Sequence, residues 1–106
     1  MIKVTYRLEN GCYTYLEVKG HALFAEYGKD LVCASVSSIV FGLMNCLDKY
    51  QDIDIKVLDN QIEINNYSKL DEINNFFKLT LIQLKTIEEP YGEYIKVERK
   101  WVWNIF

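Results

Sequence analysis

Apolar and polar residues alternate along five short stretches of the chain, which is the pattern of half-buried β-strands. Near the N-terminus, apolar side chains recur at every second position from Ile2 to Leu8, and the Asn10-Gly11 pair that follows is a strong signal for a hairpin turn. Asp59-Asn60 is predicted as a second turn, and the second strand is expected to end at Gly20. The strands are predicted over residues 2–9, 13–18, 53–58, 61–67 and 94–103.

Two longer stretches repeat their apolar residues at every third or fourth position, which predicts two helices. The first is expected from residue 30 to about residue 50, after a loop over residues 21–29. The second is expected from about residue 69 to residue 88, because Pro90 and Gly92 follow it. The core-facing residues are predicted to be Val36, Ile39, Val40, Leu43, Met44 and Leu47 in the first helix, and Ile73, Phe76, Phe77, Leu81 and Leu84 in the second.

The predicted order of elements is β-β-α-β-β-α-β. Strands joined by short turns form hairpins, and hairpins outnumber strand–helix–strand crossovers in this order. We therefore expect an α+β fold with two layers, a mainly antiparallel sheet and two helices. A chain of 106 residues has the usual size of one domain, so residues 1–106 are predicted to form a single domain.

Charge and composition argue against several classes of function. The formal net charge is −3 and Lys and Arg are not clustered, so direct binding to nucleic acid is not expected. No apolar run approaches the roughly 18 residues that span a bilayer, and the N-terminus lacks the apolar region of a signal peptide. Three cysteines at unrelated spacings do not form a disulfide framework, which favours a reducing, cytoplasmic location.

Cys33 and His21 are the candidate catalytic residues. A thiol becomes a strong nucleophile when its thiolate form is favoured, and both the start of a helix and a nearby base promote this. With Asp30 as the helix N-cap, Cys33 takes the third helical position, and His21, the only histidine, lies on the preceding loop. The N–H groups around Cys33 and Ala34 are then expected to stabilise an oxyanion. Taken alone, a single cysteine more often has a structural role in the core.

Four residues around this pair are candidates for supporting roles. Asp30 either caps the helix or orients the histidine, and the sequence leaves both open. Ser37 lies one helical turn after Cys33, where its hydroxyl bonds either the sulfur or the loop, or else bonds back to the Cys33 carbonyl. Gly20 and Gly28 bracket the loop as candidate hinges, and the loop is expected to become ordered over a substrate.

Neither a metal nor a cofactor is expected. A zinc site built from cysteine normally includes two cysteines a few positions apart, and no such pair occurs here. Cys12 lies beside the predicted hairpin turn and Cys46 lies late in the first helix, so both are assigned to packing or to the surface.

The segment from residue 20 to residue 37 resembles the signature of a bacterial family, the ribosomal-processing cysteine proteases (Prp). That signature reads Gly-His-Ala, then Gly-x-Asp-x-Val-Cys-Ala-x-Val-Ser. All of its elements are present here: Gly20, His21, Ala22, Gly28, Asp30, Val32, Cys33, Ala34, Val36 and Ser37. Further similarity lies at Pro90-Tyr91 and over residues 94–97. The family consists of single-domain proteins, so the resemblance covers essentially the whole chain.

The resemblance implies a cysteine endopeptidase that uses Cys33 and His21 as a catalytic dyad. Its implied substrate is the precursor of large-subunit ribosomal protein number twenty-seven, from which the family removes an N-terminal extension by cleaving after a phenylalanine. The alternative is a non-catalytic ribosome-associated assembly factor, which a basic patch would favour. A thiol oxidoreductase is a third reading, but a second cysteine at short spacing is missing.

A homodimer is also expected. The first predicted helix carries apolar residues on more than one face, because Ile39, Phe41 and Leu43 lean away from its main stripe. A small two-layer domain covers only one such face with its own sheet, so a second copy is expected to cover the remainder. The resembling family is dimeric, which points the same way.

Overall fold

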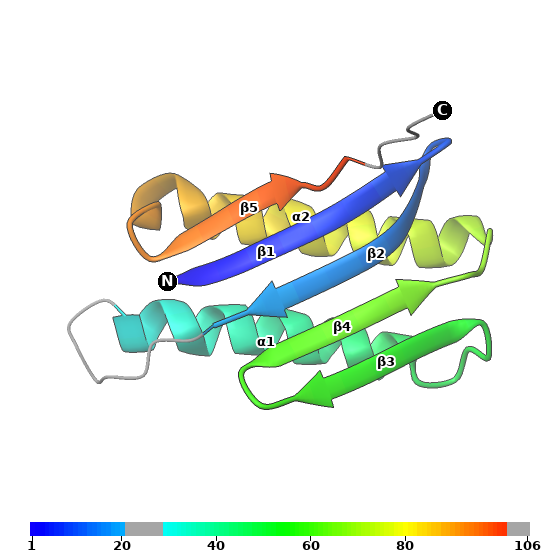
Figure 1. Ribbon diagram of the computed structural model, residues 1–106, viewed down its shortest axis with the longest axis horizontal. Coiled ribbons are helices and arrows are strands. Elements are labelled where there is room, and N and C mark those ends of the chain that lie inside the picture. Colours follow the sequence, from blue (N-terminus) through cyan, green and yellow to red (C-terminus); the bar gives the residue numbers. More distant parts are fainter. Residues whose placement is uncertain (21–28, 102–106) are drawn as a thin grey trace.

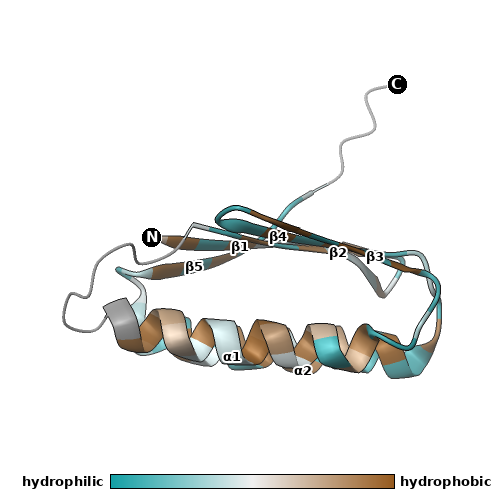
Figure 2. Cartoon of the chain, turned by 90° about the horizontal axis from the view of Figure 1, so that it is seen from below, coloured by the Kyte–Doolittle hydropathy of each residue, from teal (hydrophilic) through white to brown (hydrophobic). Residues whose placement is uncertain are grey.

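Two helices lie side by side on one face of a five-stranded sheet (Figures 1 and 2). The structure is a computed structural model, and it describes residues 1–20 and 29–101. The elements are β1 (Ile2–Glu9), β2 (Cys12–Lys19), α1 (Lys29–Leu47), β3 (Ile53–Leu58), β4 (Gln61–Asn66), α2 (Asp71–Tyr91) and β5 (Ile95–Arg99). The predicted α+β fold, with two layers and the order β-β-α-β-β-α-β, is confirmed.

The strands lie in the order β3-β4-β2-β1-β5 across the sheet. Three of the four neighbouring pairs are antiparallel, and only β1 and β5 run parallel. The predicted turns at Asn10-Gly11 and Asp59-Asn60 close the two hairpins. Their tight backbone requires positive φ angles, which are found at Asn10 (52°), Gly11 (78°) and Asn60 (61°). A parallel neighbour is reached only through a crossover, and α2 supplies it before β5.

The core lies between the sheet and the two helices. It consists of Ile2, Val4, Leu16, Val18, Val32, Val36, Val40, Leu43, Leu47, Ile64, Ile73, Phe77, Leu81, Leu84 and Ile95. The predicted stripes of both helices are therefore largely confirmed, and Ile39, Met44 and Phe76 are half-buried against this core. Within the described residues, no helix is both long and apolar enough to cross a membrane.

Pro90 lies inside α2, which corrects the prediction that it ends the helix. The helix continues to Tyr91, and Gly92 follows as its C-cap. A proline has no backbone N–H to donate to the carbonyl four residues earlier, so α2 lacks this helical hydrogen bond at Pro90. Ile87 and Tyr91 pack against the core, so tertiary contacts hold this last turn in place.

Other helices and strands begin or end a few residues away from the predicted positions. α2 begins at residue 71, because side-chain hydrogen bonds shape the chain before it: Asn66 Oδ1 accepts from the Ser68 N–H at 3.0 Å, and Ser68 Oγ accepts from the Leu70 N–H at 3.1 Å. α1 ends at residue 47 and β5 at residue 99, both earlier than predicted. The predicted part of the last strand beyond residue 101 lies outside the described residues.

Gly20 holds the end of β2 in a conformation that favours glycine. Its φ is +79°, and its N–H donates to the Asn60 carbonyl at 2.9 Å. A Cβ at this position would lie only 2.6 Å from the Met1 carbonyl oxygen. The exit from β2 is therefore fixed between the N-terminus and the β3–β4 turn.

Replacing Gly20 with alanine is expected to destabilise the protein by about 1–3 kcal/mol, because the new Cβ meets both a strained φ and a backbone oxygen. Urea unfolding of the purified variant measures this loss. Gly42→Ala is the matched control, since Gly42 lies in α1 with nothing within 4 Å of its added Cβ. That change is expected to stabilise the protein by roughly 0.5–1 kcal/mol. Equal unfolding midpoints for Gly20→Ala and the wild type would contradict the conclusion that this position requires glycine.

Candidate active site

Cys33 lies near the start of α1 and is half-buried. The helix begins at Lys29, so Asp30 is its second residue and Cys33 its fifth, which corrects the predicted N-cap and the predicted third position. Burial of Val32 holds this first turn against the core, so the helix extends ahead of Asp30. The N–H groups of the first three residues of a helix, here residues 29–31, have no partner within it. The oxyanion donors predicted at Cys33 and Ala34 are therefore engaged inside the helix.

A groove of about 320 Å³ opens beside Cys33. One wall is a ridge of α1 with Cys33, Ser37 and Phe41 at four-residue spacing, and the other wall is Val57 and Leu58 of β3. The remaining lining residues are Ile2, Val18, Gly20, Val36, Val40, Asn60, Gln61 and Ile62. Most of these side chains are apolar, so the groove suits an apolar ligand group placed next to a thiol.

Ser37 lines the same groove as Cys33, as their spacing on one helix face predicted. Serine in a helix often donates to the carbonyl four residues earlier, and Ser35 does so to the Leu31 carbonyl at 2.8 Å. Among the described residues, the Ser37 hydroxyl makes no such bond to the Cys33 carbonyl. The hydroxyl is therefore available to a group in the groove.

His21 and Gly28 lie outside the described residues, as does the predicted loop apart from Lys29. The backbone of Asp30 is helical, and its side chain is not described. Gly20, the residue directly before His21 in the sequence, lines the groove. The chain therefore enters the segment with the only histidine from the rim of the groove that holds Cys33.

Phe41, Val57 and Leu58 are groove residues that the sequence analysis did not assign to the site. All three are exposed apolar side chains. The sequence carries one signal for the pair on β3, because two consecutive apolar residues break the alternation just before the turn. The apolar pattern of the first helix predicts that a second copy covers Phe41, whereas in the structure this side chain borders the groove.

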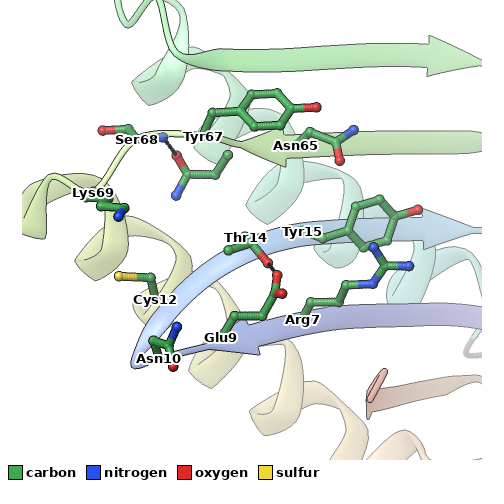
Figure 3. A pocket seen from close by; sticks show the side chains of 11 residues that line it. Arg7, Glu9, Asn10, Cys12, Thr14, Tyr15, Asn65, Tyr67, Ser68 and Lys69 are labelled. Atoms are coloured by element: carbon green, nitrogen blue, oxygen red, sulfur yellow. Dashed lines mark hydrogen bonds between the residues drawn. The ribbon is translucent and has the colours of Figure 1, made fainter. Parts of the chain in front are cut away.

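A second cavity of about 600 Å³ lies at the opposite end of the sheet, where β1 ends and β2 begins (Figure 3). There the Arg7 guanidinium lies over the Tyr15 ring at 4.9 Å, and the Thr14 hydroxyl donates to the Glu9 carboxylate. This cavity contains Cys12 but shares no lining residue with the groove on α1. The only histidine follows directly on a residue of the groove, so the groove is the candidate active site.

A free, half-buried thiol near a helix start, beside an open apolar groove in a small α+β domain, suits an enzyme with a cysteine nucleophile such as a cysteine peptidase. Comparison with known proteins gives the family. The sequence model of the family described as cysteine protease Prp matches residues 1–96. This chain belongs to that family and is a cysteine protease. The non-catalytic alternative considered from the sequence is therefore wrong.

Several relatives match along nearly their whole length. The ribosomal processing cysteine protease Prp of Mycoplasma genitalium is 33% identical over 102 residues, which cover 94% of this chain and 97% of that protein. Two crystal structures of an essential ribosomal processing protease Prp from Staphylococcus aureus have the same fold. The complex with a substrate peptide has a TM-score of 0.86 at 32% identity, and the complex with a covalently linked product peptide has a TM-score of 0.84 at 33% identity. Each match covers 94% of this chain and all of the other.

Proposed function

We propose that this cysteine protease removes the N-terminal extension from the precursor of large-subunit ribosomal protein number twenty-seven, with Cys33 as nucleophile and His21 as general base. The observation that carries the proposal is the apolar groove with the Cys33 thiol in its wall. The relatives named for ribosomal processing support it, since one was crystallised with a substrate peptide. Residues 1–106 act as one domain in this proposal.

The reaction begins when the Cys33 thiol transfers its proton to His21. The thiolate attacks the carbonyl carbon of the scissile peptide bond, and negative charge moves onto the carbonyl oxygen. Collapse of this intermediate breaks the C–N bond, and the leaving amine takes the proton from His21, which leaves a thioester on Cys33. Water then gives a proton to His21 and attacks the thioester, which releases the new carboxylate and restores the thiol. The product peptide covalently linked to a relative supports a covalent step.

We assign the groove to the side chain that precedes the scissile bond, an aromatic residue. Phe41 lies on one wall and Val57 and Leu58 on the other, so an aromatic ring meets apolar surface on both sides. Burying such a side chain contributes about 1.5–3 kcal/mol. This energy is enough to favour an aromatic residue over a small one by roughly tenfold or more.

Four residues support the dyad in this proposal. The Ser37 hydroxyl, which borders the groove, bonds the sulfur of Cys33 or the bound peptide. Asp30 orients His21 in this proposal, and the start of α1 at Lys29 places Asp30 inside the first turn rather than at the N-cap. Gly20 and Gly28 are the proposed hinges on either side of the segment that carries His21, and Gly28 lies outside the described residues.

The proposed reaction takes place in the cytoplasm, on a protein substrate. A free catalytic thiol requires reducing conditions, which the cytoplasm maintains. The steps above use neither a metal nor a cofactor, and they require no direct contact with nucleic acid.

Incubation of the wild-type protein with the precursor, followed by N-terminal sequencing of the product, is expected to give one new N-terminus directly after an aromatic residue. Cys33→Ala is expected to abolish this cleavage, and His21→Ala to slow it by roughly 10²-fold or more, the usual size of general-base catalysis. Cys46→Ala is the matched control, because Cys46 is an exposed residue of the same helix. Wild-type cleavage rates in Cys33→Ala would eliminate the nucleophile assignment.

Alkylation by iodoacetamide, followed by mass spectrometry over time, is expected to label Cys33 first. Cys46 is exposed and Cys33 only half-buried, so accessibility alone predicts the opposite order. A thiol whose proton is taken by His21 reacts faster in spite of its burial. In His21→Ala, labelling of Cys46 should precede that of Cys33. Faster labelling of Cys46 in the wild type would count against activation of Cys33.

We also propose a homodimer, formed through the exposed side of the helix layer. The dimer interface predicted from the sequence included Ile39 and Leu43 of α1. In the structure Leu43 is buried and Ile39 is half-buried within one chain, where α1 packs beside α2, so another surface must form the interface. The exposed apolar residues of α2 are Leu79 and Ile82, three positions apart on one face. A second copy that covers these two side chains removes apolar surface from water.

Light scattering at micromolar concentration is expected to give twice the chain mass of 12.5 kDa. Replacing both Leu79 and Ile82 with glutamate should reduce the mass to that of one chain, because two charges oppose burial at the interface. Lys3→Glu, which also introduces a negative charge but at an exposed residue of β1 outside the helix layer, serves as the control and should leave the mass unchanged. A wild-type mass of 12.5 kDa would overturn the dimer without affecting the catalytic proposal.

A further inference from the structure

The two edges of the sheet differ in how their backbone groups are covered. β5 forms one edge, and the N–H of its residue Val97 donates to Glu88 Oε2 of α2 at 2.7 Å. β3 forms the other edge (Figure 1). Among residues 1–20 and 29–101, neither a strand nor a side chain makes hydrogen bonds to the outer side of β3. An open edge presents unpaired N–H and C=O groups that another extended segment can pair with.

The register between β3 and β4 shows which backbone N–H and C=O groups of β3 point away from β4. β3 and β4 close on the pair Leu58 and Gln61 around a two-residue turn, and a pair that closes such a turn exchanges both backbone hydrogen bonds. Along an antiparallel pair of strands, hydrogen-bonded pairs alternate with pairs whose N–H and C=O groups point away from the partner. Counted back from the turn, the residues that direct these groups outward are Ile53, Ile55 and Val57.

The open edge of β3 continues into the groove that holds the thiol. Val57 belongs to both, since its side chain lines the groove opposite Cys33, Ser37 and Phe41. Side chains on this ridge of α1 recur every four residues, about 6 Å apart along the helix axis. Alternate side chains of an extended peptide recur about 6.6 Å apart. A peptide that runs beside β3 therefore presents every second side chain to the ridge at nearly matching intervals.

We propose that the substrate binds as an additional strand on the open edge of β3, with alternate side chains in the groove and the scissile bond beside Cys33. This inference rests on the proposed function, because the occupant is the peptide that the protease cleaves. A segment that pairs with β3 and fills the groove lies next to the Cys33 thiol. A substrate must reach this thiol, whereas a second copy of this protein need not, so we favour a substrate as the occupant. Backbone pairing then supplies affinity that is independent of sequence, and the groove selects the side chains.

A backbone scan of the precursor peptide tests this binding mode. Each amide N–H except that of the scissile bond is replaced in turn by an N-methyl group, and kcat/KM is measured with the wild-type enzyme. Pairing with β3 predicts a loss of roughly tenfold at every second position, because only alternate amides face the strand and lose a hydrogen bond there. Losses without alternation, or no loss at any position, would overturn the proposal.

Val57 offers a matched pair of enzyme variants. Val57→Pro removes the outward N–H, and Val57→Ala keeps it while shortening the same side chain. Val57 is 59% exposed, and its N–H does not pair with β4, so an edge strand tolerates proline here. We expect Val57→Pro to lower kcat/KM roughly fivefold further than Val57→Ala. Equal kcat/KM in the two folded variants would contradict pairing at this position.

The outcomes separate this proposal from the proposed function. If the wild type fails to cleave the unmodified peptide, or if Cys33→Ala cleaves it, the proposed function is wrong. If cleavage needs Cys33 but the N-methyl scan shows no alternation, only the strand pairing is wrong. If Val57→Pro halves the mass in light scattering and leaves kcat/KM at the level of Val57→Ala, the edge joins two copies and the substrate binds elsewhere.

Discussion

Burial of one row of valines fixes the rotation of α1 against the sheet, and the active-site groove depends on that rotation. The row consists of Val32, Val36 and Val40, each 3% exposed or less. Removing each side chain from water contributes about 1.5–3 kcal/mol. The residue after each valine is turned by about 100° around the helix axis, and these residues are Cys33, Ser37 and Phe41. Any rotation that moved the thiol away from the groove would expose this row, so the core itself holds the nucleophile at the groove.

The sheet contributes to the same site through its ends and its edges. The end of β2 is held at Gly20 by the Asn60 carbonyl, and the same turn carries the hairpin wall of the groove. The β5 edge is occupied by Glu88 of α2, whereas β3 extends to the groove with its outer backbone groups unpaired among the described residues. One end of a small sheet therefore combines a fixed chain exit, an apolar wall and an open edge around a single thiol.

Predictions from sequence periodicity were most accurate for features that depend on the local repeat of apolar residues. The stripes on both helices and the two tight turns were predicted, because each depends on neighbours a few positions apart. The helix ends were less accurate. α2 passes through Pro90 since Ile87 and Tyr91 pack on the core, and α1 starts before Asp30 since Val32 is anchored there. In both cases a tertiary contact outweighs a local signal for starting or ending a helix.

The sequence by itself determined the elements, the fold class, the face that Cys33 shares with Ser37, and a motif from Gly20 to Ser37 specific enough to indicate the family. These properties are set by residues close together in the chain, through backbone geometry and the periods of helices and strands. Only the tertiary structure decided that β5 lies parallel to β1 and that Val57 and Leu58 form the wall opposite Cys33. It also decided that β3 is, among the described residues, an open edge. These features depend on contacts between distant segments, because the order of strands and the packing of α1 are fixed by burial of the shared core rather than by any local pattern.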